Sequence, residues 1–288
     1  MANLMEKYMK KIAFSCLLLT ALIFTPFVSA QTDTGFRGQS MNGSTGLFSI
    51  PSGHIGWEIA GDFALDLGYR AVINNSDGIA HIPAVTLSLF KSVELSAALD
   101  CQPNFNYSSN KENEDLLLGL KIKLPTTRNT AIALGGNLQL INMNSEDFNY
   151  IAYQPYIAIS CSGIFFSMPV ETTVIFGKTF YSGRPNNSNI DFGMGFDLLL
   201  FPNVFKNTVH LILDFANFSY SDNSWPNYSY DYTSAWNRGI LNTGFRIDLT
   251  SLSALNELKF LIDIIFNDLF DDGERSFTIG AVLGFSVR

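Results

Sequence analysis

The sequence predicts an all-β fold, a closed antiparallel transmembrane β-barrel of about twelve strands. Three observations carry this prediction. Apolar and polar residues alternate with a period of two along most of the chain, the composition is unusually apolar, and the first thirty residues have the pattern of a secretory leader.

The composition separates this chain from ordinary soluble proteins. Hydrophobic residues make up 47% of the 288 residues and charged residues only 15%, against roughly 25% charged residues in an average soluble protein. Yet no apolar run after residue 30 reaches the about 18 residues that a membrane-spanning helix needs. Two folds remain, a membrane barrel and a large soluble periplasmic β-protein.

The N-terminus indicates export. Three lysines between residues 7 and 11 precede an apolar stretch at 12–24, Pro26 ends that stretch, and Val28-Ser29-Ala30 supplies small residues for cleavage. We therefore expect a signal peptide at residues 1–30, with an uncleaved anchor helix as the alternative. A segment at 31–56 would then enter from the periplasm, and residues 57–288 would form a barrel in the bacterial outer membrane.

The charge argues against one class of partner. Removal of residues 1–30 takes away three lysines and one glutamate, which leaves 15 basic and 25 acidic side chains and a net charge near −10. Nucleic acid is not expected as a partner, because phosphate binding needs a basic surface.

Each predicted strand repeats one pattern, which is cleanest at 189–200. There Phe192 and Phe196 share one face, and Asp191, Gly193 and Asp197 share the other. A membrane barrel turns the apolar face to lipid and the polar face inward. A soluble β-protein would instead need polar outer faces, which this strand and the one at 277–285 contradict. The predicted strands are 57–70, 81–90, 93–101, 116–124, 132–142, 150–162, 168–178, 189–200, 209–215, 238–249, 258–267 and 276–286.

The connections between these strands alternate in length. Links at 91–92, 125–128 and 202–203 are short, whereas those at 71–80, 102–115 and 217–238 are long and polar. Bacterial barrels have short periplasmic turns and long outer loops, so the alternation sets the orientation. Two links expected in the periplasm, 163–167 and 250–257, are longer than this pattern favours.

The inward faces carry more acidic than basic residues. One interpretation is a charge-paired, plugged interior that stabilises the barrel, and the other is a narrow water-filled pore that favours cations or polyols. The predicted pore-lining residues are Glu58, Asp62, Asp66, Glu94, Lys121, Lys123, Glu171, Asp191, Asp197, His210, Asp214, Arg246, Asp248, Lys259 and Asp263.

Two further regions suggest partners besides outer-membrane lipid. The loop at 217–238 is aromatic and polar, and it is either a lid or a surface that binds a glycan or a host protein. Its candidate residues are Trp225, Tyr228, Tyr230, Tyr232 and Trp236. Near the C-terminus, Thr278, Gly280, Leu283 and Phe285 resemble the signal by which outer-membrane barrels bind the barrel-assembly machinery.

Signs of catalysis are weak. The sequence has no G-x-S-x-G or H-E-x-x-H motif and no Cys/His metal spacing, and its three histidines are far apart. We therefore expect no catalytic residue, no metal and no cofactor. Cys101 and Cys161 should lie at opposite ends of the barrel, too far apart for a disulfide.

Residues 43–53 read Gly-Ser-Thr-Gly-Leu-Phe-Ser-Ile-Pro-Ser-Gly. This element resembles the N-terminal "TGL…PS" element of the YjbH-like outer-membrane proteins. The resemblance implies a bent segment ahead of the first long strand and a link to exopolysaccharide production. It covers about eleven residues of a chain that is shorter than those proteins.

The function predicted from these patterns is transport, as a narrow channel for passive passage of small solutes or glycan. The alternative is a non-conducting structural or surface-binding barrel that acts, like an adhesin, through its extracellular loops.

Overall fold

The computed structural model describes residues 37–58, 61–74, 78–102, 113–126, 129–141, 150–182, 190–216, 240–250, 257–270 and 275–287. The predicted signal peptide and the candidate loop residues between 217 and 238 lie outside these ranges. No helix in the described residues is long and apolar enough to cross a membrane.

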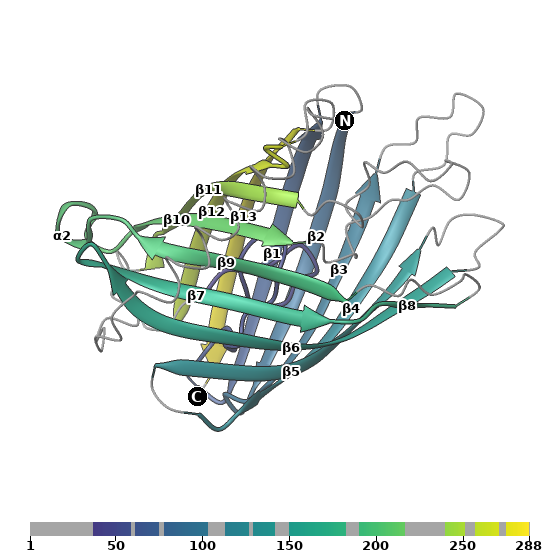
Figure 1. Ribbon diagram of the computed structural model, residues 1–288, viewed down its shortest axis with the longest axis horizontal. Coiled ribbons are helices and arrows are strands. Elements are labelled where there is room, and N and C mark those ends of the chain that lie inside the picture. The colour runs from purple at the N-terminus through teal and green to yellow at the C-terminus, as the bar shows by residue number, and fades with distance from the viewer. Residues whose placement is uncertain are drawn as a thin grey trace, which may run out of the picture.

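The described chain is a closed antiparallel barrel of twelve long strands (Figure 1). A two-residue strand, β8, continues the line of β7 and pairs with β6. The strands are β1 (Phe63–Asn74), β2 (Gly78–Leu89), β3 (Val93–Gln102), β4 (Asn113–Leu124), β5 (Thr130–Ile141), β6 (Tyr150–Phe165), β7 (Met168–Gly177), β8 (Phe180–Tyr181), β9 (Asp191–Leu199), β10 (Val209–Ala216), β11 (Ile240–Asp248), β12 (Leu258–Asn267) and β13 (Ser276–Val287). A short helix, α2 (Pro202–Phe205), lies between β9 and β10.

Closure follows from two pairings. β1 pairs with β13 along its whole length, from Phe63 opposite Val287 to Asn74 opposite Ser276. β5 pairs with β6, which joins the two ends of the strand order. Each long strand therefore has a neighbour on both sides, as a β-structure in lipid requires.

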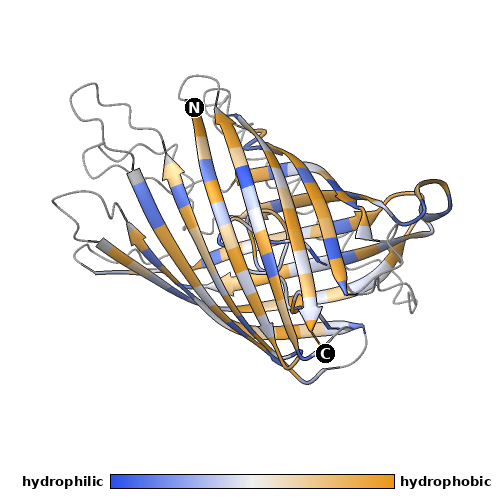
Figure 2. Cartoon of the chain, turned by 180° about the vertical axis from the view of Figure 1, so that it is seen from behind, coloured by the Kyte–Doolittle hydropathy of each residue, from blue (hydrophilic) through white to orange (hydrophobic). Residues whose placement is uncertain are grey.

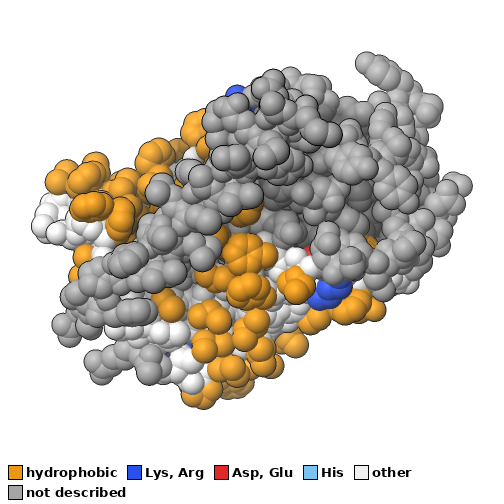
Figure 3. Space-filling model, in the orientation of Figure 1, with side chains coloured by type: hydrophobic (Ala, Val, Ile, Leu, Met, Phe, Trp, Pro, Cys, Tyr) orange, Lys and Arg blue, Asp and Glu red, His pale blue; other side chains and the backbone are white. Residues whose placement is uncertain are grey.

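The wall has two chemically different faces, as the alternation predicted. On β13, Ile279, Leu283 and Phe285 are 45%, 45% and 40% exposed, whereas Thr278 is fully buried on the opposite face. Figure 2 shows the same alternation as bands along the strands, and Figure 3 shows hydrophobic side chains over the visible wall. A closed barrel with an apolar exterior is how β-proteins span the bacterial outer membrane. This chain is a bacterial outer-membrane β-barrel.

Several predicted boundaries need correction. The first strand begins at Phe63 instead of Trp57, because Trp57 is buried inside the barrel. The link predicted at 71–80 shrinks to 75–77, because β1 and β2 both extend further. The link predicted at 163–167 is a tight turn at Phe166 and Ser167.

Cys101 lies near the end of β3, whereas Cys161 on β6 pairs with Thr130 at the start of β5. The two cysteines therefore lie toward opposite ends of the barrel, as predicted. Recognition of β13 by the assembly machinery stays a prediction.

Candidate functional site

Residues 37–58, which we call the lumen segment, lie inside the barrel. Most of them are buried, and Ile50, Ile55 and Trp57 are at most 1% exposed. The segment forms no long strand. Its bridges, which join Gln39 with Thr45 and Gly46 with Pro51, are internal, and so are the backbone–backbone hydrogen bonds that the structure describes for it.

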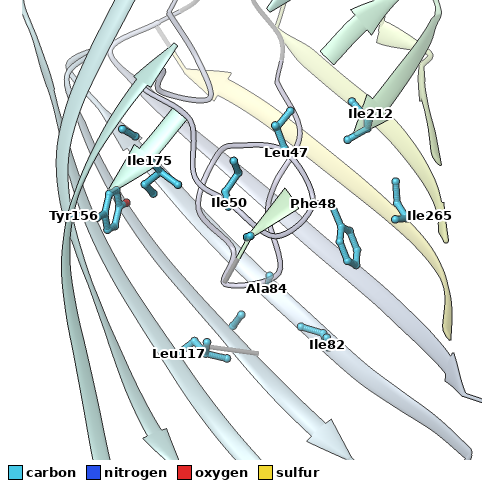
Figure 4. Close-up of a cluster of buried hydrophobic side chains, with 13 residues drawn as sticks. Leu47, Phe48, Ile50, Ile82, Ala84, Leu117, Tyr156, Ile175, Ile212 and Ile265 are labelled. Atoms are coloured by element: carbon cyan, nitrogen blue, oxygen red, sulfur yellow. The ribbon is translucent and has the colours of Figure 1, made fainter. Parts of the chain in front are cut away.

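The middle of the lumen segment packs against apolar wall residues. Leu47, Phe48 and Ile50 form one buried cluster with side chains from strands around the barrel. Figure 4 shows these three residues in the centre, with Ile82, Leu117, Tyr156, Ile175, Ile212 and Ile265 around them. Around these three residues the barrel interior is a packed hydrophobic core, which the segment and the inward side chains of the wall form together.

Glu94 on β3 holds two parts of the lumen segment at once. Its carboxylate accepts hydrogen bonds from Ser44 Oγ at 2.8 Å, Thr45 N at 2.8 Å and Gly56 N at 3.2 Å. Lys121 on β4 lies 3.0 Å from the same carboxylate and donates to Thr45 O at 2.9 Å. The pair thus joins the outgoing and returning halves of the segment to adjacent strands.

Asp214 on β10 holds the tip. It accepts hydrogen bonds from Phe48 N at 2.8 Å, Ser49 N at 2.7 Å and Asn242 Nδ2 at 2.8 Å. Its buried carboxyl group therefore has neutral donors aimed at it. The tip cannot shift along the barrel axis without breaking several of these bonds.

Two arginines bind backbone carbonyls of the lumen segment. Arg70 on β1 donates to Ser40 O at 3.2 Å and also to Gln39 O. Arg246 on β11 donates to Gly46 O at 3.2 Å and forms a bidentate pair with Asp263, at 2.7 and 3.2 Å.

The returning end of the segment is fixed by Trp57. Its indole N–H donates to Asp66 Oδ1 at 2.6 Å, and Lys259 lies 2.5 Å from the other carboxylate oxygen. Lys259 also lies 5.2 Å from the Trp57 ring centroid, within cation–π range. The Trp57 ring thus covers the buried ion pair between Asp66 on β1 and Lys259 on β12, the two strands that flank β13.

An ionic cluster lies where the lumen segment meets the start of β7 and the end of β4. His54 contacts Glu58 at 2.8 Å and Glu171 at 3.4 Å, Arg37 pairs with Glu171 at 2.5 Å, and Lys123 pairs with Glu58 at 2.6 Å. Burial would raise the pKa of Glu58, but the hydrogen bond and charge of His54, with the charge of Arg37, hold that pKa well below its usual range. Both ends of the segment therefore lie toward the end of the barrel that carries the short turns.

Wall glycines make room for the segment. A Cβ atom built at Gly193 would lie 2.7 Å from Ile50 Cγ2, and one at Gly195 would lie 2.6 Å from Leu47 Cδ1. Carbon atoms normally approach only to about 3.5 Å. Glycine at these two β9 positions lets the apolar tip dock against the wall.

Most of the predicted pore-lining residues contact the lumen segment. These are Asp66, Glu94, Lys121, Lys123, Glu171, Asp214, Arg246 and Lys259. Glu58 belongs to the segment itself, and Asp62 is exposed just before β1.

The other predicted wall residues are paired with one another or with neighbouring wall groups. His210 lies 2.6 Å from Asp197, and Asp263 pairs with Arg246. Asp191 accepts hydrogen bonds from Gln154 and Thr179, and Asp248 accepts one from Thr250 N.

Sequence reasoning missed the partners on the segment and one important wall residue. Arg70 has the same parity as Asp66 on β1, so alternation alone could have placed it on the inward face. No comparable signal identifies Gln39, Ser44 or Thr45, because the lumen segment has no regular period.

No family model and no curated protein matches the chain. Solved structures that are similar include the KdgM porin in complex with disordered oligogalacturonate, with 8% identity, a TM-score of 0.47 and coverage of 77% of this chain and 99% of the porin. LpxR from Salmonella typhimurium has 10% identity, a TM-score of 0.44 and coverage of 77% and 100%. Omp33 from Acinetobacter baumannii has 11% identity, a TM-score of 0.39 and coverage of 78% and 98%. The relation of residues 43–53 to the YjbH-like family stays a prediction.

Proposed function

We propose that this barrel is an outer-membrane channel for small polar solutes that its own lumen segment closes at rest. The observation that carries the proposal is a polar, charged lumen occupied by a segment that is not part of the wall. Passage then requires that residues 37–58 move.

The way the lumen segment is held supports this reading. Wall side chains and its own backbone supply its hydrogen bonds, and the strand ladder of the barrel does not run through it. It can therefore leave without breaking the pairing that closes the wall. Both of its ends lie toward the end with the short turns, so the direction of exit is the periplasm.

The charges on the inner face of the wall suggest which solutes would pass. Eight predicted acidic wall residues on the strands face five bases, counting Arg70 with the four predicted ones. An acidic excess in a narrow lumen favours cations and uncharged polyols over anions. We infer the same preference here for the open state.

A second candidate is a permanently closed barrel that acts through its outer loops on a glycan or a host protein. The buried apolar cluster around Leu47, Phe48 and Ile50 favours it. Movement of the segment would expose these apolar side chains to water, which is costly.

The experiment that separates these functions is single-channel recording in a planar bilayer. We would compare the mature chain with a variant in which residues 37–58 are replaced by a flexible glycine-serine linker of equal length. The proposal expects a mostly silent mature chain with brief openings, and steady openings in the variant. Asp197→Asn in the linker variant should lower its preference for cations.

A locked barrel is the control. Ser49 Oγ lies 2.9 Å from Asp214 Oδ1, so cysteines at these positions, with Cys101 and Cys161 replaced by serine, can be joined by a short thiol crosslinker. The crosslinked protein should never open. A folded linker variant that stays silent would rule out the channel and leave the closed barrel as the function.

A further inference from the structure

The wall binds residues 45–49 of the lumen segment mainly through their main chain. Glu94 on β3 accepts a hydrogen bond from Thr45 N at 2.8 Å. Lys121, which pairs with Glu94 from β4, donates to Thr45 O at 2.9 Å. One ion pair on adjacent strands therefore binds both backbone groups of a single residue.

The following residues of this stretch are bound in the same way. Arg246 on β11 donates to Gly46 O at 3.2 Å. A single oxygen of Asp214 on β10 accepts hydrogen bonds from Phe48 N at 2.8 Å and Ser49 N at 2.7 Å. Consecutive N–H groups that converge on one oxygen are a feature of a peptide turn. A polyol has no such pair of groups.

Side chains of the same stretch add a second level of recognition. Thr45 Oγ1 donates to Glu94 at 2.5 Å, and Ser49 Oγ donates to Asp214 at 2.9 Å. The two residues before Ser49 are apolar and belong to the buried cluster in the centre of Figure 4. A Cβ atom at Gly46 would overlap a carbonyl oxygen of the turn. The wall thus fits the pattern hydroxyl, glycine, apolar, apolar, hydroxyl.

The groups that bind this stretch belong to the wall and have partners of their own. Glu94 lies 3.0 Å from Lys121, and Asp214 accepts a hydrogen bond from Asn242 Nδ2 at 2.8 Å. Arg246 has its own carboxylate partner on β12. These contacts do not involve the lumen segment, so they hold the groups in place when the segment leaves. A prearranged set of donors and acceptors binds a ligand at a low cost in ordering.

We propose that the open lumen binds short peptides, and that residues 45–49 occupy this site at rest as an internal competitor. The ligand is a peptide turn with the pattern hydroxyl, glycine, apolar, apolar, hydroxyl, and the wall binds mainly its main chain. This inference rests on the proposed function, because a ligand reaches these groups only after the lumen segment moves.

Peptide binding to the linker variant tests the proposal. The probe is a fluorescent peptide with the sequence of residues 43–51, and the control is the same peptide N-methylated at the amides of Phe48 and Ser49. With the linker variant folded in phospholipid vesicles, fluorescence anisotropy should show saturable binding of the probe. N-methylation keeps every side chain but removes both donors to Asp214, so it should weaken binding by about tenfold or more.

Two wall variants test whether the probe binds at the proposed site. Asp214→Ala in the linker variant should weaken binding of the probe and remove the difference between the two peptides. Leu213→Ala, at the neighbouring outward position of β10, should leave both affinities unchanged.

Two results would overturn main-chain recognition of peptides. The first is equal affinity of the linker variant for the probe and for the N-methylated peptide. The second is displacement of the probe by an equal concentration of maltohexaose, which would mean that the lumen binds polyols in general.

Conductance of the same linker variant separates this inference from the proposed function. Block of its openings by the probe, and not by the N-methylated peptide, would support both. Steady openings with neither block nor binding would overturn the peptide inference and keep the channel. Probe binding to a folded but silent variant would overturn the channel and keep the peptide site.

A full-length variant covers the case in which the linker variant does not fold. Ser49→Cys, with Cys101 and Cys161 replaced by serine, reports the position of the tip through its reaction rate with an aqueous thiol reagent. Ile50→Ala in the same chain loosens the packing of the tip. Excess probe should displace the tip and raise the rate severalfold, whereas the N-methylated peptide should not. An unchanged rate would contradict the proposal.

Discussion

The two faces of the barrel wall come from the same strands, yet they differ in how specific their residues must be. On the inner face, individual groups have named partners, such as Glu94 with Ser44, Thr45 and Gly56. On the outer face, large apolar side chains such as Leu120 and Leu134 are 46% and 48% exposed to the surroundings.

The difference follows from what each face meets. Lipid chains are fluid and adapt to any apolar surface, so an outward position needs only an apolar side chain. The lumen segment is a single peptide with fixed donors and acceptors, so an inward position needs one particular size and charge. The comparison predicts that equal substitutions have unequal effects on the two faces.

The largest effect is expected on the inner face at Glu94. Glu94→Ala leaves Lys121 buried without its carboxylate and removes the acceptor of several segment donors, so we expect the free energy of unfolding to fall by about 3–5 kcal/mol. Urea unfolding of the barrel in vesicles measures it. The double variant Glu94→Met with Lys121→Met should recover much of this loss. A loss under about 1 kcal/mol in Glu94→Ala would mean that the segment is not held there.

A charge on the outer face comes next. Leu120 and Lys121 are neighbours on β4 that point to opposite faces, and Lys121 is 1% exposed in an ion pair. Leu120→Lys puts the same charge in hydrocarbon, so we expect a cost of about 2–4 kcal/mol. The same unfolding measurement applies, with Leu120→Met as the control. No loss of stability would place this part of the wall outside the bilayer core.

The smallest effects should come from removing one methylene. Ile212 is 1% exposed inside the barrel, and Ile122 is 44% exposed on its outer face. Ile212→Val should lower the free energy of unfolding by about 0.5–1.5 kcal/mol, because the lost methyl group leaves a cavity in the packed interior. Ile122→Val should cost less than that, because lipid fills the space. Equal losses of stability at the two positions would mean that the inner face is no more tightly packed than the outer face.

Alternation was enough to assign the strands and most inward residues. Asp66, Glu94 and Lys259 could be placed on the inner face because their neighbours in sequence are apolar. Strand ends were less certain. Trp57 fits the alternation of β1 as an outward-facing residue, yet it lies in the lumen segment. What the inward charges would meet, water or protein, did not follow from their own strands.

The sequence by itself determined an outer-membrane barrel, because a period of two along twelve segments sorts every strand into a lipid face and a lumen face by local chemistry alone. Only the tertiary structure decided that residues 37–58 occupy the lumen. That segment has no period, and its partners, from Arg70 to Lys259, come from strands spread over the whole chain. A set of contacts so distant in sequence exists only once the barrel has closed around the segment.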